Sequence, residues 1–365
     1  MRPRVGRPLL ALLAALAVLI AAAPTVLAES GEPVALDDGW SFVADPGNEG
    51  LGAGRATGGG EGWQEVDVPH VMLPEPVEEN MPGTIGWYRT TFEGPESEDG
   101  RGWAVRFGSV RREATVWLNG REIATHRDPY TPFTVPLRGL REGEDNTLVV
   151  RVDGRKGVEP REGWWNWGGI VRPVALEPLG QVEYEGAAVM SDVSCKDGGE
   201  VCDARVLVDG WVRNRSDRPQ APEVAVELRR SEEKEEEGGI AAQGRVRAPT
   251  IAPGERTRVR FAMPVTGPLD LWAPEEPDLY TATLETSLGD EVEDVHTQRV
   301  GLRQVDVRDG LLHLNGRVIE LRGASIQEDA PGRGPALTDE DIERTVSRLK
   351  ALNANVTRAH YLLDR

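Results

Sequence analysis

The sequence predicts a mainly β chain, in which two β-sandwiches precede one strand–helix–strand unit, and three observations support this order. From Val34 to Pro178, short strand-like runs alternate with turns, as in an all-β sandwich. From Gln181 to Arg303, apolar residues recur at every second position, as on strands with one buried face. After Leu302 the pattern changes, and one segment there has the helical spacing of apolar residues.

Residues 1–28 have the organisation of a secretory signal peptide and are excluded from the predicted fold. Arg2, Arg4 and Arg7 form a positive start, and the apolar run "LLALLAALAVLIAAAP" follows them. "VLA", ending at Ala28, places small residues where a signal peptidase cuts. We therefore expect a secreted or extracytoplasmic protein; an uncleaved membrane anchor is the alternative.

The charge of the chain limits its partners. The 365 residues carry a net charge of −19, and removal of the three arginines of the signal takes it to −22. Such a chain repels the phosphates of nucleic acids and anionic membrane surfaces. No segment after the signal is apolar enough to span a bilayer. We expect no nucleic-acid partner and no membrane association after signal cleavage, which leaves neutral small molecules and glycans open.

The first predicted domain covers residues 29–180. Asn119-Gly120 lies between two strand-like runs, which is a strong signal for a hairpin. Many short strands at regular spacing predict a sandwich or jelly roll. The clearest strand-like runs are "WAVRFGSV", "ATVWLNGREIATH" and "NTLVVRVDG".

The second predicted domain covers residues 181–303. Its alternating strands and its length predict a seven-strand immunoglobulin-like sandwich, which typically has about 100 residues. The charged run "SEEKEEEGG", residues 231–239, falls between two strands and is expected to be a solvated hairpin loop. The alternating strands are "ARVLVDGWVRN", "EVAVELRR", "RTRVRFAMPV" and "LYTATLETSL".

Two cysteines, Cys195 and Cys202, are separated by "KDGGEV". The Asp-Gly-Gly sequence forms turns, and export exposes thiols to oxidising conditions. We expect a disulfide across a hairpin. Two cysteines are too few for a zinc site, and no other metal-ligand cluster is visible, so the sequence predicts neither a metal nor a cofactor.

Residues 304–365 combine strand and helix signals. In "LLHLNGRVIELRGA", Asn315-Gly316 predicts a hairpin and "VIELRGA" a further strand. Thr338 is a candidate N-cap for a helix that Asn353 would stop, and "NVTRAHY" then forms another strand. This is one βαβ unit, the beginning of a parallel sheet. The predicted apolar helix face consists of Ile342, Val346, Leu349 and Leu352.

Six segments, in order, resemble those of glycoside hydrolase family 2, the β-galactosidase and β-glucuronidase group. The resemblance covers nearly all of the chain after the signal. It implies a jelly-roll sugar-binding-type domain, an immunoglobulin-like domain and, from residue 304 to 365, the start of an incomplete (β/α)8 barrel. The segments are "GWYRTTF", "VWLNGREI", "WNWGGIVRPVALEP", "DLWAPEEPDLYTATLE", "VGLRQVDVRDGLLHLNGRVIELRGAS" and "LKALNANVTRAHY".

The resemblance implies a retaining mechanism with two glutamates on later barrel strands, about 5–5.5 Å apart. We expect both to lie beyond residue 365, so we assign no catalytic residue here. Glu328, in "SIQEDAP", follows the first barrel strand and would lie on the correct face. It lacks an identifiable partner, and a single acid cannot carry out double displacement.

Arg358 and His360 match the sugar-contacting R-x-x-H-Y motif of the family, with one residue fewer between them and Leu362 where proline is frequent. Their donors suit sugar hydroxyls and developing charge, although a structural ion pair of Arg358 is an equal alternative. Gln327 stands where many members have histidine. A glutamine can hydrogen-bond a hydroxyl but cannot titrate, which argues against a galactosidase-type subsite.

In this family the first domain contributes a loop to the active site, and "EENMPGTIGWY" resembles that loop. Asn80 matches its sugar-facing asparagine, but the role of a turn-former before Pro82 is favoured. Gly163 stands where members often have aspartate. Trp165, with its neighbours Trp164 and Trp167, could stack on a sugar or pack between domains, and packing is favoured.

Two functions follow. The first is the N-terminal part of a secreted retaining β-glycosidase of family 2 type, inactive alone, with a glycan or glycoside as substrate. The alternative is a non-catalytic secreted carbohydrate-binding protein. The first is favoured because two barrel strands alone leave a sheet edge and apolar faces uncovered. The sequence predicts neither the sugar nor the oligomeric state.

Overall fold

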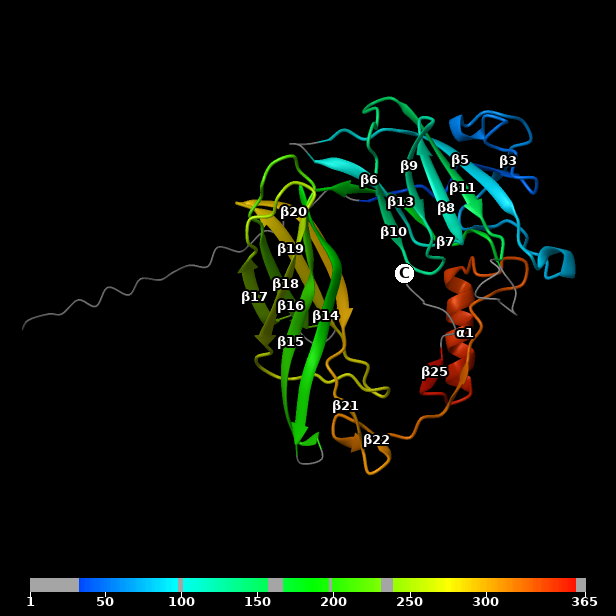
Figure 1. The fold of residues 1–365 in the computed structure, drawn as a ribbon. Coiled ribbons are helices and arrows are strands. Elements are labelled where there is room, and N and C mark those ends of the chain that lie inside the picture. The colour runs from blue at the N-terminus through cyan, green and yellow to red at the C-terminus, as the bar shows by residue number, and fades with distance from the viewer. Residues whose placement is uncertain (1–32, 98–100, 157–166, 197–198, 231–238, 359–365) are drawn as a thin grey trace, which may run out of the picture.

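The computed structural model describes residues 33–97, 101–156, 167–196, 199–230 and 239–358. Its strands form two sandwiches that lie side by side, and a smaller unit extends from the second sandwich back toward the first (Figure 1). We call these parts the first sandwich (residues 33–179), the second sandwich (182–300) and the C-terminal unit (304–358). The predicted signal, residues 1–28, lies outside the described residues.

The first sandwich packs a four-stranded sheet, in the order β1-β13-β6-β10, against a six-stranded sheet, β3-β2-β5-β11-β8-β9. Both sheets contribute to one core: Phe107 and Leu176 from the former, Tyr88 and Leu148 from the latter. The four strands are β1 (Val34–Ala35), β6 (Gly102–Phe107), β10 (Phe133–Pro136) and β13 (Val174–Leu179). The six strands are β2 (Trp40–Ala44), β3 (Gln64–Val66), β5 (Ile85–Glu93), β8 (Glu113–Leu118), β9 (Arg121–His126) and β11 (Asp145–Asp153).

A small third sheet, β4-β12-β7, closes one end of the first sandwich. Its strands are β4 (His70–Val71), β7 (Val110–Arg111) and β12 (Gly169–Ile170), and the connections also contain two short 3₁₀ helices, η1 (Arg55–Thr57) and η2 (Glu78–Asn80).

The hairpin predicted at Asn119-Gly120 is confirmed as the β8–β9 turn. Both residues have positive φ, 51° and 81°, as the tight turn between twisted strands requires. The Asn119 side chain also holds the neighbouring strand, because its Oδ1 accepts from the Thr147 amide at 2.9 Å and its Nδ2 donates to Asn146 Oδ1 at 2.9 Å.

The second sandwich packs the sheet β14-β15-β18 against the sheet β17-β16-β19-β20. Alternate residues of these strands fill the core, for example Val206 and Val208 from one sheet and Leu228 and Leu284 from the other. The strands are β14 (Val182–Lys196), β15 (Val201–Asn214), β16 (Glu223–Arg230), β17 (Ile240–Arg247), β18 (Arg256–Pro264), β19 (Tyr280–Leu288) and β20 (Glu291–Val300). Of the predicted charged loop, only residue 239 lies within the described residues.

Glu293 joins the two sandwiches. Its buried carboxylate accepts from the Gln181 amide at 2.8 Å and lies 3.7 Å from the Arg101 guanidinium of the first sandwich. Gly180 passes so close that a Cβ there would lie 2.1 Å from the Glu293 carbonyl oxygen. The connection is therefore a packed contact rather than a free linker.

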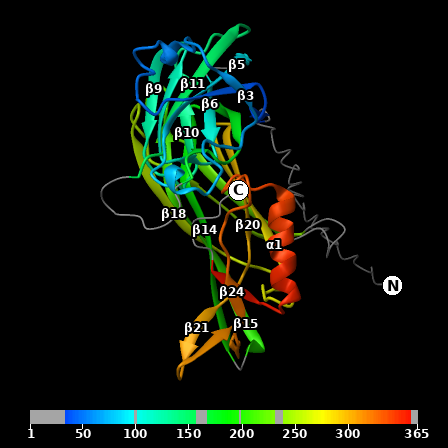
Figure 2. The ribbon, with the colours of Figure 1, turned by 90° about the vertical axis from the view of Figure 1, so that its right-hand side faces the viewer.

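The C-terminal unit contains an antiparallel sheet β21-β22-β23, one helix and a two-stranded parallel sheet (Figure 2). The parallel pairing across α1 confirms the predicted strand–helix–strand unit. The predicted strand "VIELRGA" is wrong in extent: residues 319–322 belong to no strand, and Leu321 is half exposed without a core to align it. The elements are β21 (Val305–Arg308), β22 (Leu311–Leu314), β23 (Arg317–Val318), β24 (Gly323–Ser325), α1 (Asp339–Ala351) and β25 (Val356–Arg358).

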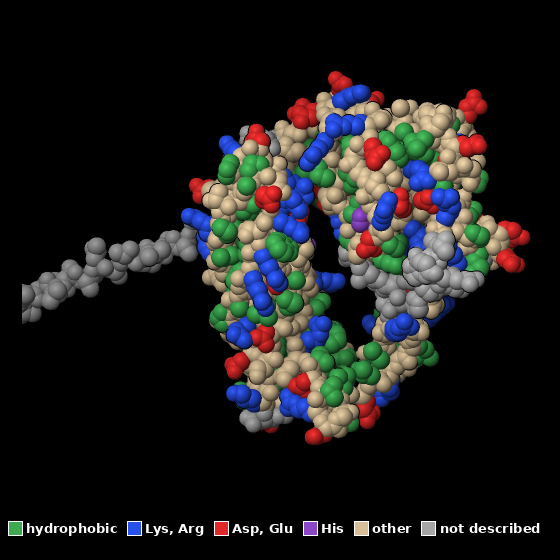
Figure 3. Space-filling model, viewed as in Figure 1, with side chains coloured by type: hydrophobic (Ala, Val, Ile, Leu, Met, Phe, Trp, Pro, Cys, Tyr) green, Lys and Arg blue, Asp and Glu red, His purple; other side chains and the backbone are tan. Residues whose placement is uncertain are grey.

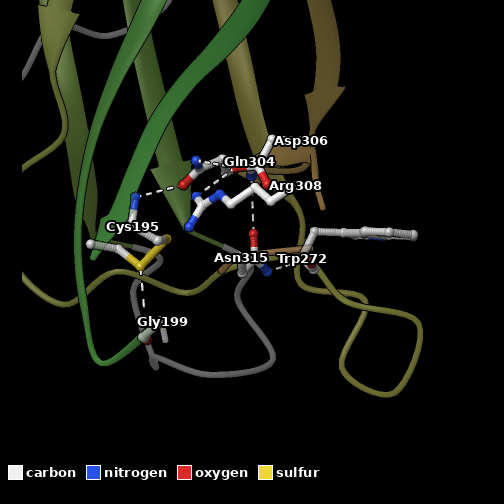
Figure 4. The surroundings of a disulfide bond; sticks show 8 residues. Cys195, Gly199, Trp272, Gln304, Asp306, Arg308 and Asn315 are labelled. Carbon is white, nitrogen blue, oxygen red and sulfur yellow. Dashed lines mark hydrogen bonds and ion pairs between the residues drawn. A yellow bond between two sulfur atoms is a disulfide. The ribbon is translucent and has the colours of Figure 1, made fainter. Parts of the chain in front are cut away.

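A disulfide joins Cys195 to Cys202, and the turn that it closes rests on the β21–β22 hairpin (Figure 4). The Cys195 amide donates to Gln304 Oε1 at 2.6 Å, and the Gln304 amide donates to Asn315 Oδ1 at 3.0 Å. A Cβ on Gly199 would lie 2.3 Å from the Asn315 carbonyl oxygen. The closed turn thus fixes where the chain enters the C-terminal unit.

Replacing both cysteines, Cys195→Ser with Cys202→Ser, should lower the free energy of unfolding of the second sandwich by about 2 kcal/mol, because the cross-link restricts the unfolded chain. Hydrogen exchange in β21 and β22 should also rise, since their support is loosened. Mass spectrometry of the wild-type protein should show a loss of two hydrogens relative to the free-thiol form. Two thiols open to alkylation would contradict the bond.

Candidate functional site

The carboxyl ends of β24 and β25 bring two of the candidate residues to one edge. The strands are parallel with Ser325 opposite Arg358, and the Ile326 amide donates to the Arg358 carbonyl oxygen at 3.2 Å. Gln327 follows one residue later, so it lies just beyond the end of β24 at the same edge where Arg358 ends β25, and both residues are exposed. An amide and a guanidinium there provide hydrogen-bond donors and one acceptor for a polar ligand.

Glu328 differs from its neighbours because it is buried, with only 4% of its surface exposed, whereas Gln327 and Asp329 are exposed. A buried carboxyl group needs polar compensation, which makes this position structurally demanding. The sequence predicted that Glu328 lies on the strand-end face, but no local pattern predicted that its side chain is buried.

The segment after β24 docks onto the first sandwich. Ala336 packs with Val71 and Val171 in a small apolar cluster, and Trp167 lies against it. A Cβ on Gly334 would lie 2.9 Å from the Trp167 ring, so glycine permits this approach. Trp167 therefore packs between two parts of the chain, which is the role that sequence reasoning favoured for the tryptophan cluster.

The Arg172 guanidinium adds a polar contact to the same interface, because it donates to the Pro335 carbonyl oxygen. Through this contact the segment around Pro335 is held against the first sandwich. Figure 3 shows a hollow in the centre of the molecule, with the second sandwich on one side of it and the C-terminal unit on the other.

Asn80 lies at the end of η2, and its side chain serves its own loop. Its Nδ2 donates to the Glu75 carbonyl oxygen at 3.0 Å, and its backbone carbonyl accepts from the Gly83 amide at 3.1 Å. This geometry is that of a turn-former. Two further candidates, His360 and Trp165, lie outside the described residues.

The N-terminus of α1 is fixed by a network that sequence reasoning found only in part. Thr338 caps the helix as predicted, and the Asp341 carboxylate bonds back to the Thr338 amide at 3.1 Å, which completes a capping box. Arg333 donates to both Asp341 oxygens, at 2.7 and 2.8 Å. These bonds hold the pKa of Asp341 well below its usual range. The Thr-x-x-Asp spacing is the sequence signal for the box; the arginine had none.

His70 lies behind the docking interface, next to Val71 on β4. Its Nδ1 is 2.8 Å from the Tyr88 hydroxyl, and its ring is 5.1 Å from that of Phe42. Burial in this aromatic setting lowers the pKa of His70 to about 4, since the charged form would lose its water. Burial also raises the pKa of Tyr88.

The folded protein binds the imidazole proton of His70 more weakly than the unfolded chain does. The stabilisation of the fold that is linked to neutral His70 is therefore complete above about pH 6.5 and is lost as the pH falls toward 4. Lowering the pH from 7.5 to 5 should therefore cost about 1–2 kcal/mol through His70 alone. His70→Gln keeps a polar contact to Tyr88 but cannot titrate. Urea unfolding of both proteins at both pH values should show the smaller loss in the variant; equal losses would refute the role of His70.

Within the described residues, no group of three or more His, Cys, Asp and Glu side chains is arranged to hold a metal ion. No helix among those residues is long and apolar enough to cross a membrane.

The family model of glycosyl hydrolases family 2 matches residues 196–303, which lie almost entirely in the second sandwich. A β-galactosidase of Bacteroides ovatus is 28% identical over 330 residues, which cover 86% of this chain. The chain is therefore similar to glycosyl hydrolases family 2, whose model matches its second sandwich. A protein of Formosa agariphila named as a putative β-glucuronidase is 23% identical over 311 residues, 83% of the chain.

Solved structures named as a putative β-galactosidase and a β-glucuronidase share the fold. A putative β-galactosidase of Bacteroides fragilis superposes with a TM-score of 0.77 over 92% of this chain at 22% identity. A β-glucuronidase of Bacteroides uniformis gives 0.76 over 91% at 23% identity. The chain spans only part of these proteins: 37% of the Bacteroides ovatus enzyme and 50% and 40% of the two solved chains.

Proposed function

We propose that this chain belongs to glycosyl hydrolases family 2 and is the N-terminal, substrate-facing part of a secreted retaining β-glycosidase that hydrolyses O-glycosyl bonds. The observation that carries the proposal is the parallel β24–β25 pair, whose carboxyl ends present Gln327 and Arg358 together beside a docked first sandwich. In barrels built from such units, active sites gather at the carboxyl ends of the strands.

In this proposal the first sandwich is a jelly-roll sugar-binding-type domain, the second is immunoglobulin-like, and the C-terminal unit begins a (β/α)8 barrel. Residues 1–28 direct export. The relatives named as β-galactosidases and β-glucuronidases support a glycoside as the substrate.

The chemistry of the proposed enzyme divides between two sets of residues. A retaining glycosidase needs a carboxylic acid that protonates the leaving oxygen and a carboxylate that attacks the anomeric carbon, about 5–5.5 Å apart. We assign both to residues beyond this chain. Arg358 would donate to sugar hydroxyls, and Gln327 would donate to one hydroxyl and accept from another. His360 is a further candidate through its ring nitrogens, and Asn80 is one through its carboxamide oxygen, since its Nδ2 already donates within its own loop.

The purified 29–365 chain should not hydrolyse aryl β-galactosides or β-glucuronides above the uncatalysed rate. Glu328 is the acid that a positive result would implicate, because it follows β24 at the strand-end face. Turnover that Glu328→Gln abolishes would overturn the assignment of both catalytic groups to residues outside the chain.

Ligand binding tests the strand-end site separately. Arg358→Ala should weaken the binding of monosaccharide glycosides at least tenfold, because a charge-assisted hydrogen bond contributes about 1.5–3 kcal/mol. Arg322→Ala is the matched control, since Arg322 is also exposed but immediately precedes β24, at the opposite strand end. Saturation-transfer NMR measures both. Equal effects of the two substitutions would move the site away from this edge.

A further inference from the structure

The outer face of the sheet β14-β15-β18 carries a row of arginines that no part of the proposed catalytic function uses. Alternation along β18 directs Val259 and Met263 into the core, which leaves Arg256, Arg258 and Arg260 on the opposite face. Strand residues two apart lie about 7 Å from each other, so the three guanidinium groups are regularly spaced. Figure 3 shows Lys and Arg side chains gathered over the second sandwich.

The carboxylates on this face lie deeper than the arginines. The side chains of Arg256, Arg258 and Arg260 are 47%, 56% and 65% exposed, whereas those of Asp209 and Glu185, with which they pair, are 15% and 24% exposed. The outermost layer of the face is therefore cationic. This contrasts with the chain as a whole, whose net charge is −19.

The guanidinium groups are held in place before any ligand arrives. Arg258 donates through Nε and Nη2 to both oxygens of Asp209, each at 2.7 Å, and the Arg260 Nε lies 3.7 Å from the same carboxylate. A bidentate pair fixes the plane of Arg258 and leaves its other N–H groups free of that pairing. Two cations thus share one anion, and fixed donors lose little entropy when a second anion binds.

An aromatic ring lies within the same row of charges. Trp211 stands opposite Arg258 in the β15–β18 pairing, is 38% exposed, and has the Arg256 guanidinium 4.6 Å from its ring centroid. Met190, on β14, is a second exposed apolar side chain on this sheet. The apolar face of a sugar ring suits an indole, while its acidic substituents suit the arginines.

We propose that this face, which we call the β18 arginine face (Trp211, Arg256, Arg258 and Arg260), binds an anionic polysaccharide whose carboxylate or sulfate groups repeat along an extended chain. Charge complementarity selects an anion, and the exposed indole selects a polymer with apolar ring faces. Duplex nucleic acid fits less well, because its bases are stacked inside the helix and leave no apolar ring face for the exposed indole of Trp211. The site is non-catalytic, and it stands independently of the proposed hydrolase function.

Binding should be measured with the whole chain by isothermal titration in about 50 mM salt, where screening is weak. Polygalacturonate provides carboxylates, dextran sulfate provides sulfates, and neutral dextran and duplex DNA are the comparison ligands. We expect saturable binding of one or both anionic polysaccharides that weakens as salt rises. Undetectable binding of both, or binding of neutral dextran or DNA at equal affinity, would overturn the proposal. The difference in affinity between polygalacturonate and dextran sulfate shows whether the face prefers carboxylate or sulfate groups.

The variants distinguish binding at the β18 arginine face from a general effect of positive charge on the surface. Arg258→Gln with Arg260→Gln should lower affinity at least tenfold, and Trp211→Leu should lower it several-fold. Arg245→Gln with Arg247→Gln makes the same charge change on β17, where two exposed arginines also share one carboxylate, Glu223, and should change affinity less than twofold. Equal losses in both double variants would refute a defined site. Circular dichroism establishes that each variant is folded, and Trp211→Leu tests the face without unpairing Asp209.

Discussion

Hydrogen exchange should be about a thousandfold faster in residues 304–358 than in the central strands of either sandwich, a difference of about 4 kcal/mol in opening free energy. The reason is the burial of apolar side chains. Tyr280, on β19, and Tyr88, on β5, are fully enclosed, whereas Val307 and Leu352 in the C-terminal unit are 70% and 72% exposed.

Every helix and strand of the C-terminal unit except β24 carries a large apolar side chain that is exposed. The three residues of β24 are themselves exposed. Burying one such side chain stabilises by about 1.5–3 kcal/mol, so the loss over several is large. They are Val305, Val307, Leu311, Val318, Leu321, Val346, Leu352 and Val356. The sheet β24-β25 has only two strands, and α1 buries only Asp341.

The exchange pattern should also vary within the unit. Residues 334–336, docked on Val71 and Val171, should exchange more slowly than β24 and β25. The β21–β22 hairpin should be intermediate in the wild-type protein, because Gln304 and Asn315 tie it to the disulfide-closed turn. Uniformly slow exchange through Arg358 would show that the unit is stable as it stands, and its strand-end residues would then form a complete, smaller site.

The fold was predictable from the sequence where local pattern and tertiary packing agree. Asn119-Gly120 requires positive φ whatever surrounds it, and the alternation of β15 and β16 directs alternate valines into a core that the sandwich provides. Asn353, with a φ of 55°, ends the helix as its position predicts. The predicted strand "VIELRGA" is wrong in extent because no core aligns it: Val318 pairs with β22, residues 319–322 belong to no strand, and Gly323 and Ala324 pair with β25.

The candidate site was predictable to a lesser extent. Gln327 and Arg358 come together because parallel strands share their carboxyl edge, which the βαβ pattern already implies. The docking of Ala336 on Val71 depends on a contact across more than two hundred residues, and Glu328 is buried although both of its sequence neighbours are exposed. Such contacts have no local sequence signal.

Trp87→Ala should lower the free energy of unfolding of the first sandwich by about 3–5 kcal/mol, the usual cost of removing a buried indole. Trp87 is fully buried, and its ring centroid is 5.3 Å from that of Trp117. Its Nε1 donates to Asp45 Oδ2 at 2.8 Å, and Asp45 also accepts from the Glu49 and Gly50 amides. The substitution leaves both a cavity and a carboxylate without one of its donors.

Trp87→Phe separates these two contributions. It retains a ring against Trp117 but removes the N–H, so it should cost about 1–3 kcal/mol, mostly from Asp45. Hydrogen bonds to Asp45 hold its pKa below the usual value, so this part of the loss should shrink as the pH falls and the carboxyl group is protonated. Urea unfolding at pH 7 and at pH 3, below the usual pKa of an aspartate, measures both, and a Trp87→Ala loss below 1 kcal/mol would contradict the packing argument.

The effect should extend to the candidate site, because neighbouring residues of β5 serve opposite faces of the sheet. Trp87 fills the outer cluster with Val43 and Val149, and Tyr88 fills the main core while contacting His70. His70 precedes Val71, on which the segment after β24 docks. Trp87→Ala should therefore also speed exchange in residues 334–336, and Arg121→Ala, on an exposed position of β9, should not. A stability loss that leaves those residues unchanged would show that the docking interface is independent of β5.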